Sequence, residues 1–125
     1  MRKMLIEQFK NYLESERRLS IHTVKAYVDD LNKFSEYIEN QYGLINLVDV
    51  EYMLVRSWIA FLMEQGLSGR SVNRKISSIK AFYKHLNKNG LIEENPTNKI
   101  VKPKVSKRLP VFIEEQNMNF LFDKI

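Results

Sequence analysis

The chain has 125 residues, of which 44% are hydrophobic and 28% are charged, and it contains no cysteine. That length suits one domain with a buried core, and the lack of cysteine excludes a disulfide framework and thiolate chemistry. Two histidines, far apart at positions 22 and 85, argue against a zinc cluster, and no apolar run approaches the ~18 residues of a membrane span. The sequence therefore predicts a soluble cytoplasmic domain without a metal, another cofactor or a membrane partner.

Apolar residues recur with the spacing of an α-helix from the start of the chain, which predicts a first helix over about residues 3–17. A second helix should follow Ser20, because a serine hydroxyl can accept a hydrogen bond from a free N–H group of the first turn. Gly43 should end that helix, because glycine readily adopts the left-handed conformation found after helix C-termini.

A third helix is predicted from Asp49, as its capping residue, to about Gln65. Its apolar residues cover almost every side, as in helices that are buried between others. A fourth helix should begin at Ser68 and reach Asn89. Because no segment alternates with the period of two that is typical of a strand, the sequence predicts an all-α fold.

The pattern changes after Gly90. Residues 97–110 read as an extended basic linker without a core-forming pattern. We expect a helical domain over residues 1–90, a basic linker over 91–110, and the start of a second, truncated domain over 111–125, where apolar residues with helical spacing continue to the end of the sequence. The alternative is that this last helix folds back onto the bundle.

The net charge of +5 is unevenly distributed along the chain. Residues 1–66 and residues 111–125 each carry a net charge of −2, whereas residues 67–110 carry +9. A segment this basic creates a local positive potential that favours polyanions such as nucleic acid. The alternative is a solvated lysine-rich surface without a partner.

The fourth predicted helix separates into two faces when its residues are placed at about 100° each. One face is apolar and consists of Val72, Ile76, Ile79, Phe82, Tyr83 and Leu86. The opposite face consists of Arg70, Arg74, Ser77, Ala81, Lys84 and Lys88, flanked by Asn73, Ser78, Lys80 and His85. The helix has six cations and no acid. Its like charges repel one another in water, but the same arrangement is favourable beside a phosphate backbone. We therefore expect DNA contacts from Arg70, Asn73, Arg74, Ser77, Lys80, Lys84 and Lys88.

The start of the second helix offers a weaker site. Ser20, Thr23 and Lys25 lie where free N–H groups and the positive end of the helix dipole favour a phosphate. For the two hydroxyl residues, plain capping of the helix is the alternative. The sequence has no recognisable catalytic constellation, since no acid pairs with a histidine and no glycine-rich phosphate loop is present.

Three groups of residues resemble the N-terminal core-binding domain of tyrosine site-specific recombinases of the Xer and phage-integrase type. They are the run LSIHTVKAY at 19–27 with Asp30, Leu31 and Phe34; the run GLSGRSVNRK at 66–75 with residues 81–83; and the pairs at 95–96, 103–104 and 109–110. Each pattern is weak by itself, but their order and spacing over residues 5–122 make the resemblance specific.

This resemblance implies a SAM-like orthogonal bundle of four helices plus a short extra one. It also implies that the chain clamps duplex DNA together with a separate C-terminal catalytic domain, within a tetramer on paired DNA sites at the nucleoid. The family's catalytic Arg, Lys, His-x-x-Arg and Tyr belong to that other domain, and this sequence has no His-x-x-Arg. We therefore expect DNA binding without catalysis. The linker cations would follow the duplex between the domains: Lys102, Lys104, Lys107 and Arg108.

Two other interpretations stay open. A helical protein–protein adaptor would use the same basic face to bind an acidic protein. A standalone helix-turn-helix repressor is disfavoured, because the connection over residues 43–48 exceeds the 3–4-residue turn of that motif.

Overall fold

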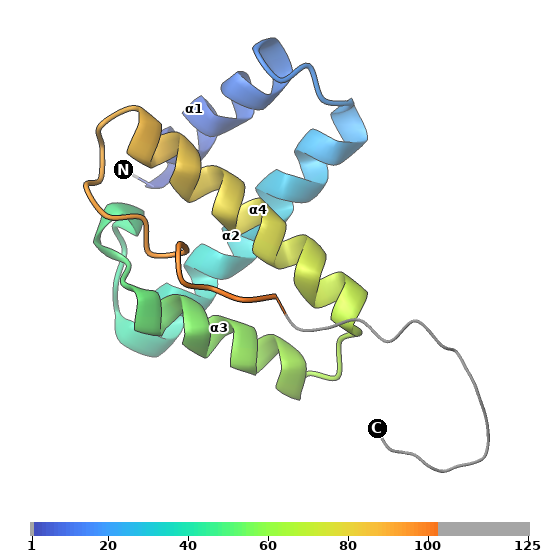
Figure 1. The fold of residues 1–125 in the computed structure, drawn as a ribbon, viewed down its shortest axis with the longest axis vertical. Helices are drawn as coiled ribbons and strands as arrows, with labels where there is room; N and C mark the ends of the chain where they lie inside the picture. The colour runs from blue at the N-terminus through green and yellow to red at the C-terminus, as the bar shows by residue number, and fades with distance from the viewer. Residues whose placement is uncertain (1, 103–125) are drawn as a thin grey trace, which may run out of the picture.

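The computed structural model describes residues 2–102, which form four α-helices, one short 3-10 helix and no strand. In chain order the elements are α1 (Arg2–Ser15), α2 (Ile21–Tyr42), η1 (Leu47–Asp49), α3 (Tyr52–Glu64) and α4 (Gly69–Lys88). Figure 1 shows α4 lying across α2, with α1 and α3 packed toward its two ends. The predicted all-α bundle with a short extra helix is confirmed.

Two serines set the starts of the longest helices in the same way. The Oγ of Ser20 accepts a hydrogen bond from the N–H of Thr23 at 3.2 Å, and the Oγ of Ser68 accepts one from Ser71 at 3.2 Å. Gly43 ends α2 with a φ of 69°, and its N–H donates to the carbonyl of Glu39. The predicted starts of α2 and α4 and the predicted end of α2 are therefore confirmed.

The prediction for the third helix is partly wrong. Asp49 does not cap it, because residues 47–49 form the separate helix η1, which is capped by the side chain of Asn46. Helix α3 begins at Tyr52 without a side-chain cap. It is also not buried on all sides: Met53 and Met63 are 64% and 53% exposed. Only one face of α3 packs into the bundle, through Val55, Trp58 and Leu62.

The core is built around aromatic side chains from different helices. The rings of Phe9 and Phe82 meet edge to face at 5.5 Å between centroids, and those of Phe34 and Trp58 do so at 5.0 Å. Tyr83 is fully buried, and its hydroxyl donates to the carbonyl of Leu47 at 2.8 Å. Burial raises the pKa of Tyr83 above its ordinary value. All six residues of the predicted apolar face of the fourth helix are buried.

Residues 91–102, the return segment, run back over the bundle beside α3 and α4 (Figure 1). Thr97 and Ile100 are 3% and 6% exposed, and the ammonium of Lys80 donates to the carbonyl of Ile100 at 2.9 Å. The expectation that residues 97–110 contribute nothing to the core is therefore wrong at these two positions. The domain boundaries at 90 and 110 stay predictions, and residues 103–125 lie outside the described part of the chain.

Candidate nucleic-acid interface

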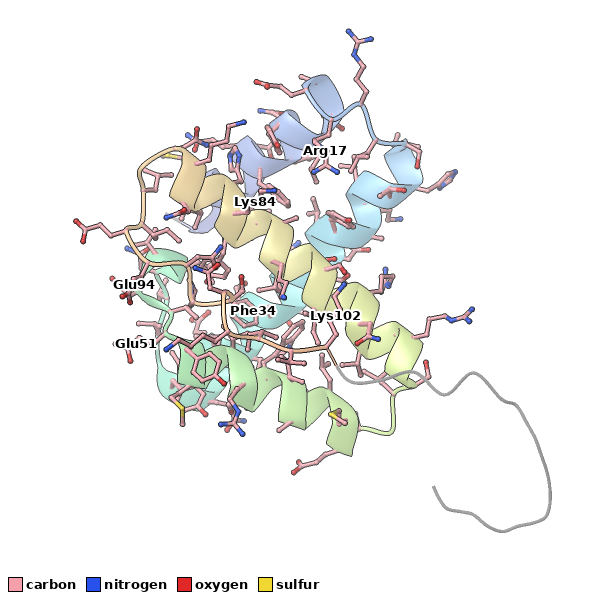
Figure 2. All side chains as sticks on the ribbon, in the orientation of Figure 1. Arg17, Phe34, Glu51, Lys84, Glu94 and Lys102 are labelled. Carbon is pink, nitrogen blue, oxygen red and sulfur yellow. The ribbon has the colours of Figure 1, made fainter. Side chains whose placement is uncertain are left out.

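The residues predicted to meet DNA on α4 lie along one side of that helix, which we call the basic face: Arg70, Asn73, Arg74, Ser77, Lys80, Lys84 and Lys88. Arg70, Arg74, Lys84 and Lys88 are exposed, and the other three are half-buried. Figure 2 shows Lys84 on α4, on the side of the bundle that faces the viewer. Because the apolar side of α4 packs into the core, these four exposed cations project from the surface.

The sixth cation of α4, Lys75, is not part of this surface. It is 8% exposed and donates from Nζ to Oδ1 of Asp30 on α2 at 3.0 Å. The same oxygen accepts from Nη2 of Arg74 at 3.2 Å, and Oδ2 accepts from the hydroxyl of Ser78 at 2.8 Å. Ser78 is fully buried, so its predicted place beside the basic face is wrong. The charge of α4 is therefore partly balanced from α2.

The return segment adds a cation to the basic face. Lys102 donates from Nζ to the hydroxyl of Ser77 at 2.6 Å, across 25 positions of sequence. Figure 2 shows Lys102 where the return segment meets α4. One turn further along α4, Lys80 holds the backbone at Ile100. Of the predicted linker cations, Lys102 is thus joined to the basic face, whereas Lys104, Lys107 and Arg108 lie outside the described residues.

The weaker predicted site at the start of α2 is occupied by capping interactions. The Ser20 hydroxyl bonds both the N–H and the Oγ1 of Thr23, at 3.2 and 3.0 Å. Lys25 is exposed one half-turn further on. Sequence reasoning missed Arg17 and Arg18, two exposed cations in the turn just before Ser20. The sequence signal for them was the pair of adjacent arginines, separated by one residue from the capping serine Ser20.

His85 packs against α1 and does not decorate the basic face as expected. Its ring lies 4.6 Å from that of Tyr12 and 5.6 Å from that of Phe9, between centroids. Burial and the nearby Lys88 lower the pKa of His85, although Glu16 opposes them. The imidazole is therefore neutral at pH 7 and adds no charge to the basic face.

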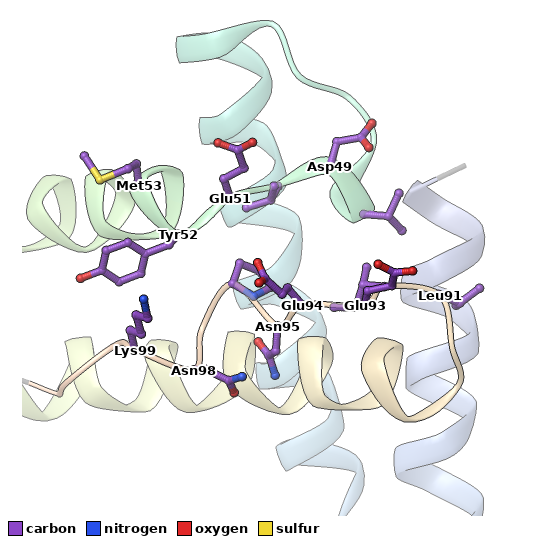
Figure 3. A pocket seen from close by; sticks show the side chains of 14 residues that line it. Asp49, Glu51, Tyr52, Met53, Leu91, Glu93, Glu94, Asn95, Asn98 and Lys99 are labelled. Atoms are coloured by element: carbon purple, nitrogen blue, oxygen red, sulfur yellow. The ribbon is translucent and has the colours of Figure 1, made fainter.

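An acidic pocket of about 850 Å³ lies between the start of α3 and the return segment (Figure 3). Four carboxylates line it together with one cation: Asp49, Glu51, Glu93, Glu94 and Lys99. In residues 2–102 no group of three or more acidic or histidine side chains is arranged to hold a metal ion. Helices within the same range are too short or too polar to cross a membrane. A pocket of this charge repels anions, whereas the exposed cations of α4 attract them.

Comparisons with a family profile and with curated proteins point to the same family. A profile of the family described as "Phage integrase, N-terminal SAM-like domain" matches residues 6–90. Tyrosine recombinase XerC of Oceanobacillus iheyensis is 38% identical over 96% of this chain and 39% of its own length. The proteins of the same name from Bacillus subtilis and Staphylococcus haemolyticus are 34% and 38% identical, over 97% and 94% of this chain and 40% and 39% of their own lengths.

The chain thus spans about 40% of the length of the curated relatives that it matches. No solved structure was found that matches it at a significant level.

Proposed function

Because the chain belongs to the family of phage integrase N-terminal SAM-like domains, we propose that it binds duplex DNA as the core-binding domain of a XerC-like tyrosine recombinase. The observation that carries this proposal is the basic face of α4. Its exposed cations project from one side of a helix whose opposite side is fixed in the core. A helix held this way can present several Lys and Arg side chains to phosphates and base edges at once.

Each part of the face has a distinct task in this proposal. Lys84 and Lys88 pair with phosphates as point charges, whereas Arg70 and Arg74 have the paired donors that match a guanine edge. Half-buried Ser77, in the middle of the face, holds the ammonium of Lys102 where it can meet a phosphate. The other members of the face, Asn73 and Lys80, extend the contact along α4.

Two further groups of residues extend the contact beyond α4. Lys102, held at Ser77, continues the face toward the return segment, and Lys104, Lys107 and Arg108 would follow the duplex from there. Ser20, Thr23 and Lys25 would hold one phosphate at the start of α2, where the helix dipole is favourable. Binding there requires the Ser20 hydroxyl to share the N–H of Thr23 with a phosphate oxygen.

In the whole protein, a separate C-terminal domain would cut and rejoin DNA through a phosphotyrosine link, and the two domains would clamp the duplex from both sides. That protein would act as a tetramer on paired sites, at the nucleoid in the cytoplasm. This chain supplies binding and not chemistry, in keeping with its lack of a His-x-x-Arg motif.

The test is fluorescence anisotropy of labelled duplexes with the 125-residue chain at low salt. Arg70→Ala should weaken binding by about 1–3 kcal/mol and relax sequence preference if Arg70 reads a base, or weaken all duplexes equally if it meets phosphate. Polyglutamate serves as an acidic competitor. If it displaces DNA at equal charge concentration, or if no duplex binds, the proposal fails and an acidic protein becomes the better partner.

A further inference from the structure

We propose that Asp30, on α2, is a positioning residue that orients the guanidinium of Arg74 for contact with DNA. This inference rests on the proposed function of the basic face. Asp30 is 1% exposed and does not itself reach the surface. It acts through Arg74, whose Nη2 lies 3.2 Å from Oδ1 of Asp30 and whose side chain is 48% exposed.

The carboxylate of Asp30 is well satisfied where it lies. Burying an ion without partners is costly, and Asp30 receives three donors: Lys75 and Arg74 on Oδ1, and Ser78 on Oδ2. All three donors come from one stretch of α4, so the carboxylate fixes both the rotation of that helix against α2 and the side chains that reach back to it. A carboxylate that is held this firmly can serve as a fixed reference point for Arg74.

The guanidinium of Arg74 is divided between the protein and solvent. A guanidinium is planar, with five donors in a rigid fork, so a bond from one terminal nitrogen to a fixed carboxylate restricts the plane of the whole group. The rest of the fork faces outward, in keeping with the half-exposed side chain. Much of the rotamer freedom that arginine would lose on binding DNA is thus lost already in the free protein.

The charges of the cluster support the same role. Two cations share one carboxylate, which leaves a net charge of +1, and Lys75 is only 10% exposed at its side chain. The remaining positive charge of the cluster is therefore exposed to solvent at the side chain of Arg74. Asp30 orients this arginine without cancelling the cluster's attraction for an anion.

The test compares Asp30→Asn, Arg74→Met and the double variant in the 125-residue chain, by anisotropy with one labelled duplex at fixed salt. Removing a negative charge should by itself strengthen DNA binding. The positioning role predicts the opposite sign: Asp30→Asn weakens binding about fivefold to tenfold, because a neutral amide oxygen holds the guanidinium of Arg74 less firmly than a carboxylate does. In the Arg74→Met background, Asp30→Asn should then have no weakening effect.

Ser78→Ala is the matched control. It removes a neutral donor from Oδ2 and leaves the bond to Arg74 in place, so it should lower the melting temperature while changing the DNA dissociation constant less than twofold. Circular dichroism at the assay temperature verifies that each variant is folded. If Asp30→Asn tightens binding, or weakens it equally with and without Arg74, the proposal is wrong.

If Asp30→Asn does not fold, the Arg74→Lys variant tests the proposal instead. Lysine keeps the charge but lacks the planar fork, so binding should fall nearly as far as in Arg74→Met. An Arg74→Lys variant that binds like the parent chain overturns the positioning role. If the parent chain itself binds no duplex, it is the proposed function of the basic face that fails.

Discussion

Replacing Lys84 and Lys88 with glutamine should lower the salt dependence of DNA binding by nearly two units of slope. Binding of a cationic surface to duplex DNA releases about 0.9 counterion per phosphate neutralised, so the logarithm of the affinity falls linearly with the logarithm of salt concentration. The surface cations that the structure gathers on one side are Arg70, Arg74, Lys80, Lys84, Lys88 and Lys102. Lys75 is left out, because it is buried against Asp30.

With one phosphate neutralised for each of these six cations, the slope is about −5.4, so raising salt from about 50 to 200 mM should weaken binding by about 2,000-fold. The double variant should have a slope of about −3.6 and lose only about 150-fold over the same range. Anisotropy titrations at four salt concentrations measure both slopes. Both lysines are exposed, so their replacement should leave the melting temperature nearly unchanged.

A variant with the same loss of charge elsewhere provides the control. Lys33 on α2 and Arg56 on α3 are exposed and lie outside the basic face. Replacing both with glutamine should leave the slope at about −5.4. Equal loss of slope in the two double variants would mean that net charge, and not the basic face, drives binding, and would refute the reasoning.

Three predictions concern stability. Tyr83→Phe leaves the buried carbonyl of Leu47 with only the N–H of Val50 as a donor, at 3.4 Å, and should cost about 1–2 kcal/mol in urea unfolding; an unchanged midpoint would mean that water replaces the hydroxyl. Ile100→Ala should cost about 2 kcal/mol if the return segment packs in solution as described, whereas a cost near zero would show that it does not. Because burial lowers the pKa of His85 in the folded state, the unfolded chain binds more protons below about pH 6.5, and stability should fall as the pH drops from there. His85→Gln should remove that part of the decrease, as measured by thermal unfolding between pH 7 and 5.5, and a parallel decrease in both proteins would contradict it.

Much of the fold was predictable from local chemistry. Ser20, Gly43 and Ser68 mark helix ends through interactions that involve only neighbouring residues, and the apolar period of α4 identifies its buried side without knowledge of what it packs against. Asp49 misled the prediction because aspartate is among the residues most favoured as helix caps. The helix η1, capped by Asn46, ends there, and α3 starts only at Tyr52.

The candidate site was predictable only in outline. Helical periodicity separates apolar from polar positions, but it cannot tell an exposed lysine from one that pairs with a buried carboxylate. Lys75 and Ser78 are buried because Asp30 lies opposite them, 45 and 48 positions earlier in the chain. The contact of Lys102 with Ser77 likewise depends on the path of the return segment. Within residues 97–102, a single buried apolar residue, Ile100, holds that path, and one residue gives no periodic pattern that a sequence could show.

The bond from Arg74 to Asp30 limits how this surface can diverge among related proteins. The side chains of Arg70 and Lys84 are exposed and make no hydrogen bond or ion pair within residues 2–102, so each can be replaced as the preferred DNA changes, with little effect on folding. Lys88 differs only in that its ammonium lies 6.0 Å from the centre of the Tyr12 ring. Position 74 is different, since its side chain shares the buried carboxylate with Lys75 and Ser78. A relative without the aspartate would keep Lys75 as a buried cation with no carboxylate beside it, so positions 30 and 75 should covary, with position 74 following them, while the other cations vary independently.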